Sequence, residues 1–310
     1  MISLQQMQYI LALNDFGQFQ KASESCFVTQ PTLSMQVKKA EEVLGHKIFN
    51  RSSSPLTLTS FGEKLIPVLR DMMIENSRID QLVQKTNGTF VEKIRVGVIP
   101  TIASYLVPAL FQRDEVRAEE VIFSFKEMHT RQLIEKLANG ELDMMILAGP
   151  FQQPGMQSIK LYEEEIKAYV QERTSDEISS EEIKVLKPWL LTEGNCLRTQ
   201  MVSFCGITSD SGLNQWDYEG GNLDLLMRMV DTQGGYTLVP EYCYSDKGRS
   251  ATLCSIRIDE NGLFPSRTII AVYPNKTVYK SSLEKLIHVI QQIYFSCGDK
   301  VYNTIGWQGD

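Results

Sequence analysis

The chain has 310 residues and a hydrophobic content of 43%, which suffices for two or more domains with ordinary cores. Its net charge of −7 argues against nucleic-acid binding by the chain as a whole, and it lacks an apolar run of about 18 residues that would span a membrane. The first residues show no basic segment followed by a small-residue cleavage site, so we expect a cytoplasmic protein.

The charge is distributed unevenly along the chain. The first 90 residues carry 9 Lys and Arg against 8 Asp and Glu, a net charge of +1, whereas the remainder carries 22 against 30, a net charge of −8. Any contact with nucleic acid is therefore expected in the first 90 residues.

Six cysteines occur in a chain without secretory features, so most are expected to be free thiols. There is no C-x-x-C motif, and the three histidines lie far apart in the sequence. We therefore predict neither a metal site nor a cofactor.

The first 50 residues predict a helix-turn-helix. An apolar stripe from Leu4 to Leu13 is typical of a helix that Gly17 ends, and a second short helix begins near Phe19. Thr29 and Pro31 indicate the start of a third helix, whose apolar residues recur at helical spacing up to Gly45. The segment 47–60 has short β character around a Ser/Pro turn, as expected of a wing.

The polar and basic residues of this region suit base edges and phosphates in a major groove. The candidate DNA-binding residues are Gln30, Pro31, Thr32, Ser34, Lys38 and Arg51. From the pattern alone, a small helical bundle with a solvated polar face remains the alternative.

A long helix is predicted from Ser60 to Asn87. Ser60 and Glu63 form a capping-box pattern, and apolar residues from Leu65 to Val83 recur at coiled-coil spacing. Such a stripe needs a partner, which is either a second subunit or the body of the same chain.

The remaining 220 residues alternate strands and helices, which indicates a parallel α/β sheet. Strands are predicted at 93–99, 121–127, 142–148, 158–170, 188–192, 236–239, 253–258 and 268–273, and helices at 100–113, 131–140, 222–233 and 281–295. Two lobes joined by two crossing strands fit this order, with a ligand cleft at the carboxyl ends of the strands. Thr101 and Thr130 both follow strands on that side, and we expect Thr130 to cap its helix.

Cys196 and Cys205 lie nine residues apart in the stretch CLRTQMVSFC. An intervening helix would separate them by roughly 13 Å of rise, whereas a disulfide needs Cα atoms within about 7 Å. A spacing that resists the bond in one conformation and permits it in another would suit a redox switch, but from the spacing alone two unrelated core cysteines remain the alternative. Cys196 follows Asn195 at a predicted helix start, where the helix dipole and Arg198 would favour a thiolate.

Several segments resemble LysR-type transcriptional regulators. KASESCFVTQPTLSMQVKKAEEVLGHKIFNR and PLTLTSFGEKL are similar to the DNA-binding domain of that family, and MVDTQGGYTLVP to its regulatory domain. TEGNCLRTQMVSFC, VIPTIASYLVP, KEMHTRQLI and SRTIIAVY resemble its peroxide-sensing branch.

The resemblance implies a multi-domain α/β protein. It implies a winged helix-turn-helix at 1–58, a linker and dimerisation helix at 59–90, and a two-lobed regulatory domain, similar to periplasmic binding proteins, at 91–310. Lobe I would comprise about 91–165 and 269–310, and lobe II about 166–268.

The resemblance also implies site roles. Cys196 would be the peroxidatic thiol and Cys205 the resolving one. The residues expected to hold peroxide or to stabilise the thiolate are Thr101, Thr130, Asn195, Arg198 and Arg267. Asn195 stands where this branch usually has His, which puts the local proton handling in doubt.

The implied function is a non-enzymatic transcription regulator that senses hydrogen peroxide. Its expected partners are double-stranded promoter DNA, RNA polymerase, further copies of the chain as a homodimer or homotetramer, and a thiol reductant of the glutaredoxin or thioredoxin type, without a membrane. The alternatives are a LysR-type regulator of a small organic effector and a thiol peroxidase.

Other polar and sulfur-containing residues are given structural interpretations. We expect Cys26, Cys243, Cys254 and Cys297 to be small core residues. Residues 163–165, three consecutive glutamates, are expected to be solvated, and His129 is left out of the predicted site.

Overall fold

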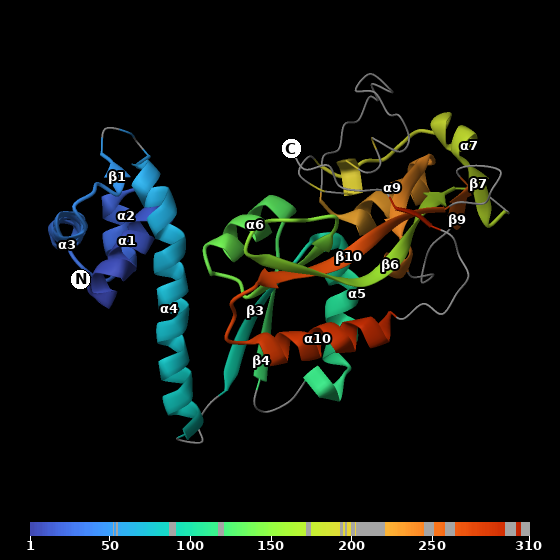
Figure 1. Ribbon diagram of the computed structural model, residues 1–310. Helices are drawn as coiled ribbons and strands as arrows, with labels where there is room; N and C mark the ends of the chain where they lie inside the picture. The colour runs from blue at the N-terminus through green and yellow to red at the C-terminus, as the bar shows by residue number, and fades with distance from the viewer. Residues whose placement is uncertain are drawn as a thin grey trace. The chain divides into compact units, whose positions relative to one another are not determined.

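The computed structural model divides the chain into two compact units, Met1–Phe90 and Val91–Asp310 (Figure 1). The described residues are 1–51, 53, 55–86, 91–116, 121–171, 175–192, 195, 197–199, 202, 221–244, 251–257, 264–294 and 302–304, of which 78, 80–82, 84–86 and 302–304 are described by their backbone only.

The first unit begins with the three predicted helices, α1 Leu4–Phe16, α2 Phe19–Ser25 and α3 Gln30–Leu44. Helix α1 ends at Gly17, whose φ of 62° is the left-handed conformation that glycine adopts readily. The hydroxyl of Thr29 accepts the N–H of Thr32 at the start of α3. The predicted boundaries of α3 are confirmed.

A two-stranded wing follows α3. Strands β1 Phe49–Asn50 and β2 Thr57–Leu58 pair antiparallel. The core of the unit is made by buried apolar residues of the helices and the wing, which include Ile10, Leu13, Leu33, Val37 and Ile48.

Glu41 of α3 joins the wing to this helix although its side chain is buried. Its Oε1 accepts the backbone N–H of Ile48 at 2.9 Å, and its Oε2 accepts from Lys47 and Arg51, each at 3.2 Å. Burial opposes ionisation of Glu41, but these donors hold its pKa below the ordinary value. One carboxylate thus fixes where the chain enters β1.

Helix α4, Ser60–Thr86, differs from its prediction in two respects. It begins at Ser60, and the cap is the preceding Thr59, whose Oγ1 accepts the N–H of Gly62, so the predicted Ser60 cap is wrong. Leu69 packs into the core of its own unit, whereas Met72, Ile79 and Val83 are 43%, 62% and 55% exposed. Only the N-terminal part of the apolar stripe therefore packs into the core of the first unit.

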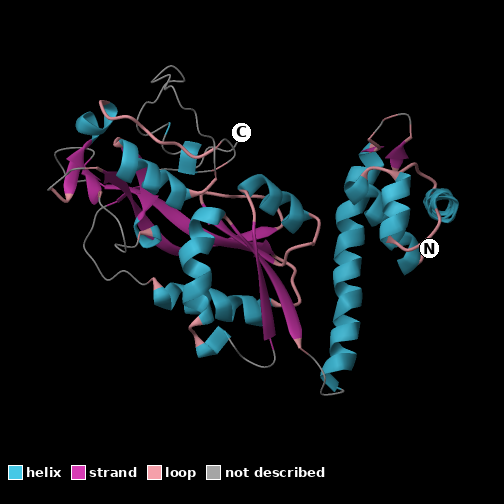
Figure 2. Cartoon of the chain, turned by 180° about the vertical axis from the view of Figure 1, so that it is seen from behind, coloured by secondary structure: helices cyan, strands magenta, loops and turns pink. Residues whose placement is uncertain are grey.

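The second unit is built on a mixed sheet (Figure 2). Among the described residues, nine strands form it, in the order β4-β3-β5-β10-β6-β9-β7, with β11 beside β10 and β8 beside β6. Their bounds are β3 Glu92–Val98, β4 Val121–Glu127, β5 Met144–Ala148, β6 Met156–Val170, β7 Glu177–Ser179, β8 Tyr236–Pro240, β9 Thr252–Arg257, β10 Phe264–Pro274 and β11 Tyr302–Thr304.

Helices cover this sheet and complete its two apolar clusters. The α-helices are α5 Pro100–Phe111, α6 Thr130–Ala138, α7 Ser180–Lys184, α9 Leu223–Gln233 and α10 Lys280–Ile293, and the short 3-10 helices are η1 Asp114–Val116 and η2 Glu241–Cys243. Helix α5 packs with β4, α6 with β5, α10 with β6 and with α5, and α9 with β6 and β8.

Strands β6 and β10 run side by side, and β6 continues past β10 to join the side of the sheet with β3, β4 and β5 to the side with β7, β8 and β9 (Figure 1). Residues 156–165 of β6 pair with β10, and residues 166–170 pair with β8 and β9. The predicted pair of crossing strands is confirmed. The predicted strand at 188–192 is wrong, because the segment forms a single bridge, between Pro188 and Tyr236.

Among the described residues, no helix is long and apolar enough to cross a membrane.

Replacing Glu41 by Gln should destabilise the first unit by ~1–3 kcal/mol, because charged acceptors of buried N–H groups are lost. The stabilisation that a lowered pKa provides is present above the unfolded-state pKa and is lost as the pH falls. The difference between wild type and E41Q in urea denaturation should therefore shrink below about pH 4.5. The exposed neighbour Glu42, changed to Gln, is the control and should cost less than about 0.5 kcal/mol.

Candidate functional site

The predicted DNA-binding residues lie on the start and the solvent face of α3 and in the wing. Gln30, Pro31 and Lys38 are exposed, and Thr32 and Ser34 are partly exposed. Arg51 is exposed as well, but it also pairs with Glu41 and lies over the ring of Phe19, 5.5 Å from its centroid. Arg51 therefore holds the wing against the helices, in addition to presenting a positive charge at the surface.

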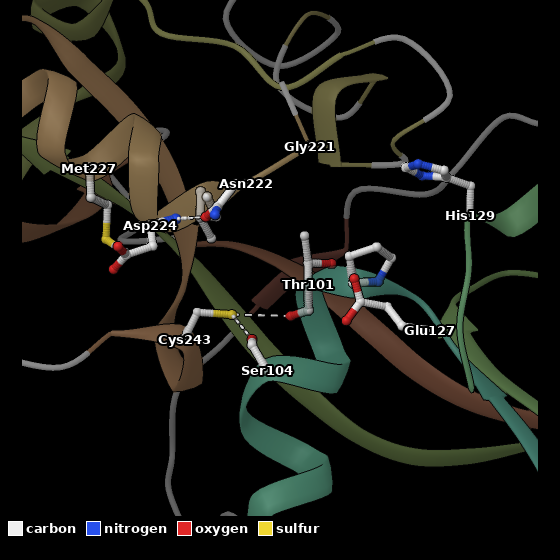
Figure 3. Close-up of a pocket in the computed structure, with 11 residues that line it drawn as sticks. Thr101, Ser104, Glu127, His129, Gly221, Asn222, Asp224, Met227 and Cys243 are labelled. Carbon is white, nitrogen blue, oxygen red and sulfur yellow. Dashed lines mark hydrogen bonds between the residues drawn. The ribbon is translucent and has the colours of Figure 1, made fainter. Parts of the chain in front are cut away.

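The second unit contains a cavity of about 520 Å³ (Figure 3). It is lined from α5, from the end of β4, from the start of α9 and from η2. The lining residues are Pro100, Thr101, Ser104, Glu127, His129, Gly221, Asn222, Leu223, Asp224, Met227 and Cys243.

Thr101 lies at the centre of this lining and is held by Arg267 of β10. Nη1 of Arg267 donates to Thr101 Oγ1 at 2.9 Å, and Nη2 donates to the Thr101 carbonyl at 3.2 Å. Both side chains are buried, and Arg267 is completely so. The structure thus brings together two of the predicted site residues that are 166 positions apart.

Glu164 is the buried partner of Arg267. Arg267 Nε donates to Glu164 Oε1 at 2.7 Å, and the two residues are direct neighbours across β6 and β10. Tyr105 donates to the same oxygen at 3.0 Å. The prediction of a solvated glutamate run is wrong, because Glu164 and Glu165 are fully buried where β6 passes between the two parts of the sheet.

Burial dominates the ionisation of this cluster. It raises the pKa of Glu164 in spite of the opposing charge and hydrogen bond of Arg267. It also raises the pKa values of Tyr105 and Tyr162, whose hydroxyl oxygens are 2.7 Å apart, well above the ordinary tyrosine value. Both phenols are therefore neutral at physiological pH.

Cys243, predicted as a core residue, packs against the second apolar cluster but is only partly buried, and it lines the cavity. Its Sγ donates to the Thr101 carbonyl at 3.1 Å and lies 3.6 Å from Ser104 Oγ (Figure 3). Burial raises the pKa of the Cys243 thiol to about 12. The sequence offered no signal that separates this cysteine from Cys254, which is buried as predicted.

The start of α6 corrects a second prediction. His129 occupies the cap position without a capping side-chain bond, and Thr130 is the first helical residue, so Thr130 is not the cap. Thr130 is buried, and His129, which the prediction left out, lines the cavity.

Asn195 caps the turn formed by residues 197–199. Its Oδ1 accepts the N–H of Leu197 at 3.1 Å, and its carbonyl accepts the N–H of Arg198 at 3.0 Å. Its Nδ2 is buried and has no hydrogen-bond partner in the structure as described. Arg198 donates through Nη1 to the Leu191 carbonyl at 2.8 Å. Cys196, Cys205 and Cys297 lie outside the described residues.

Within the described ranges, no group of three or more His, Cys, Asp or Glu side chains is arranged to hold a metal ion.

Comparison with known proteins decides the family. A family model described as "LysR substrate binding domain" matches residues 87–293, and a second, "Bacterial regulatory helix-turn-helix protein, lysR family", matches residues 4–63.

The chain belongs to the LysR family.

Several LysR-family relatives are similar over almost their whole length. The transcriptional regulator EstR of Acinetobacter baylyi is 24% identical over 94% of this chain and 97% of its own. The hydrogen peroxide-inducible genes activator of Pectobacterium carotovorum is 26% identical over 94% and 96%. A solved structure of a full-length OxyR variant from Pseudomonas aeruginosa has a TM-score of 0.71 and 27% identity, over 94% of this chain and 98% of that one.

The family assignment explains the two units as a DNA-binding helix-turn-helix and a regulatory domain of this LysR-family chain. The helical-bundle alternative for the first 60 residues is thereby excluded.

Changing Thr101 to Val keeps the shape of the side chain but removes the oxygen that Arg267 Nη1 donates to. We expect a loss of ~1–3 kcal/mol in the free energy of unfolding of the second unit, because a buried charged donor loses an acceptor. Urea denaturation followed by tryptophan fluorescence measures it. Thr232→Val, at an exposed position of α9, is the matched control and should stay within about 0.5 kcal/mol.

Proposed function

We propose that this LysR-family chain is a DNA-binding transcription regulator that senses hydrogen peroxide through Cys196, with Cys205 as the resolving thiol. The observation that carries the proposal is the cavity in which Arg267 holds Thr101, together with the capped turn that Asn195 begins next to Cys196. The similarity to peroxide-inducible activators and to OxyR supports it.

The chemistry proceeds in two displacement steps. The Cys196 thiolate attacks one oxygen of hydrogen peroxide, the O–O bond breaks, and the leaving hydroxide takes a proton to become water. Cys196 is then a sulfenic acid. The Cys205 thiolate attacks that sulfur, the S–O bond breaks, the leaving hydroxide takes a proton to become a second water, and a disulfide remains.

The described residues supply binding and electrostatics for the first step. Thr101, fixed by Arg267, would offer a hydroxyl to peroxide, and the buried Nδ2 of Asn195, which has no partner among the described residues, would be a donor next to Cys196 in the sequence. The N-terminus of the turn that Asn195 caps favours negative charge. Thr130 and Arg198 are assigned supporting roles in this site.

The disulfide would act on DNA through the quaternary structure. Both redox forms would bind promoter DNA as a homodimer or homotetramer. Repacking of the segment between the cysteines would change which major grooves, about 10 bp apart, the α3 helices reach. The oxidised form would contact RNA polymerase, and a thiol reductant of the glutaredoxin or thioredoxin type would restore the dithiol.

A second candidate function is the sensing of a small organic effector. The cavity volume of about 520 Å³ falls within the range of small-molecule pockets and far exceeds one peroxide molecule. This function predicts a rise in melting temperature with a metabolite rather than with peroxide, and no role for Cys196 in the response.

Cys196→Ser should retain DNA binding and lose the response to peroxide, because no thiolate remains to attack it. Footprinting on a target promoter before and after brief dilute peroxide measures both properties. Mass spectrometry of the wild-type peptides should show the loss of two hydrogens in a linked Cys196–Cys205 pair. Cys254→Ser, a buried thiol whose Sγ donates to the Ser175 carbonyl, is the control and should respond as wild type. A normal response in Cys196→Ser contradicts the proposal.

Lys38→Gln should weaken DNA binding to all sequences similarly and reduce the salt dependence of log K by roughly 1, because one phosphate contact is lost. Fluorescence anisotropy at several salt concentrations measures this slope. Lys136→Gln removes a comparable cation from the second unit and should leave the slope unchanged. An unchanged slope in Lys38→Gln would remove this residue from the interface.

A further inference from the structure

The cavity contains a second thiol that the proposed mechanism does not use. Cys243 lies on η2 and lines the same cavity as Thr101, the residue assigned to peroxide binding. Its Sγ is the hydrogen-bond donor to the Thr101 carbonyl at 3.1 Å. A carbonyl oxygen has no proton to give, so this contact requires Cys243 to carry its proton.

Arg267 creates a difficulty for this protonated thiol. Its Nη2 donates to the same Thr101 carbonyl as Cys243, so a buried positive charge lies close to the sulfur. A neighbouring cation favours the thiolate, which is the form that attacks peroxide. Without compensation, Arg267 would make Cys243 a competing target for oxidant.

Glu164 provides the compensation. Its Oε1 is 2.7 Å from Arg267 Nε, and both side chains have no exposed surface, so solvent does not screen their interaction. The two residues are in register across β6 and β10, which fixes the pair to the central strands of the sheet. Tyr105 donates to the same oxygen and keeps the carboxylate oriented.

We propose that Glu164 is a specificity-determining residue, which neutralises Arg267 and thereby keeps Cys243 protonated, so that oxidant in the cavity meets a single reactive thiol. The identity of that reactive thiol as Cys196 rests on the proposed function. The protonation of Cys243 does not.

The other groups around the pair agree with this assignment. Tyr105 of α5 and Tyr162 of β6 are neutral, since burial raises their pKa values well above the ordinary value. Glu241, on η2 with Cys243, adds a further negative charge, which raises the pKa of Glu164. Burial raises the pKa of Cys243 to about 12, with Glu164 adding to the rise while Arg267 and Ser104 oppose it.

The first test measures Cys243 in the Cys196→Ser protein, so that its outcome does not depend on whether Cys196 senses peroxide. The thiol is alkylated with iodoacetamide between pH 7 and 10.5, and the Cys243 peptide is quantified by mass spectrometry. We expect the rate to rise about tenfold per pH unit over the whole range, because the thiolate fraction does so below the pKa. A thiol with an ordinary pKa would level off near pH 9, as the urea-denatured protein should, and that result would overturn the proposal.

The second test assigns the effect to the charge of Glu164. E164Q keeps an oxygen that accepts from Arg267 and Tyr105 but removes the negative charge, so alkylation of Cys243 at pH 8 should accelerate roughly tenfold for each pKa unit lost. The double variant E164Q/R267Q removes both charges and should return toward the parent rate.

The double variant separates charge from loosened packing. Equal acceleration in E164Q and in E164Q/R267Q would mean that the cavity has opened, and it would overturn the role of the carboxylate. No acceleration in a folded E164Q would overturn it as well. If E164Q does not fold, the pH profile of Cys243 in the parent protein still decides whether the thiol is held protonated. Peroxide footprinting with the intact Cys196 tests the proposed function separately.

Discussion

The ion pair between Arg267 and Glu164 is the contact on which the arrangement of the regulatory unit depends. A buried charge is tolerated only when it is paired and hydrogen-bonded, so each residue confines the other to the point where β6 and β10 lie in register. The pair also holds two residues one turn apart on α5, since Arg267 donates to Thr101 and Glu164 accepts from Tyr105. The α5 wall of the cavity is thereby fixed to β6 and β10.

A buried carboxylate has the same kind of role in the DNA-binding unit. Glu41 on α3 accepts from the backbone at the entry to β1 and from Lys47 and Arg51. The apolar core positions α3 against its neighbours, but apolar packing is non-directional and does not fix the path of the chain after the helix. Directional hydrogen bonds donated to one charged carboxylate fix the path of the chain at that point. In both units, the functional face is therefore positioned by a glutamate that is buried in spite of its charge.

Features that depend on interactions between residues close in the sequence were predictable, and features that depend on contacts between distant residues were not. The boundaries of α3 depend on Thr29, Pro31 and Gly45, all of which act within a turn of the helix, so they were predicted correctly. The glutamates at 163–165 were misjudged because the partner of Glu164 lies 103 residues away, and a charge run gives no sign of a strand that is covered on both faces. Cys243 was misjudged for the same reason, because its position in the cavity depends on how η2 meets α5. Thr101 and Arg267 were found through the family resemblance, and their contact could not have been derived from spacing.

The pairing of Arg267 also bears on how a thiolate would be stabilised in this regulator. A guanidinium that is neutralised at 2.7 Å by a buried carboxylate contributes less to a distant anion than an unpaired one, because the two fields largely cancel. Under the proposed function, selectivity between the two thiols then depends on local groups. At Cys243 the nearest polar contact is a carbonyl oxygen, which opposes negative charge. Next to Cys196, the Asn195 side chain caps a helical turn and leaves a buried N–H group without a partner in the described structure, an arrangement that favours negative charge. Under the proposed function, the same arginine can therefore orient Thr101 without favouring the thiolate form of Cys243.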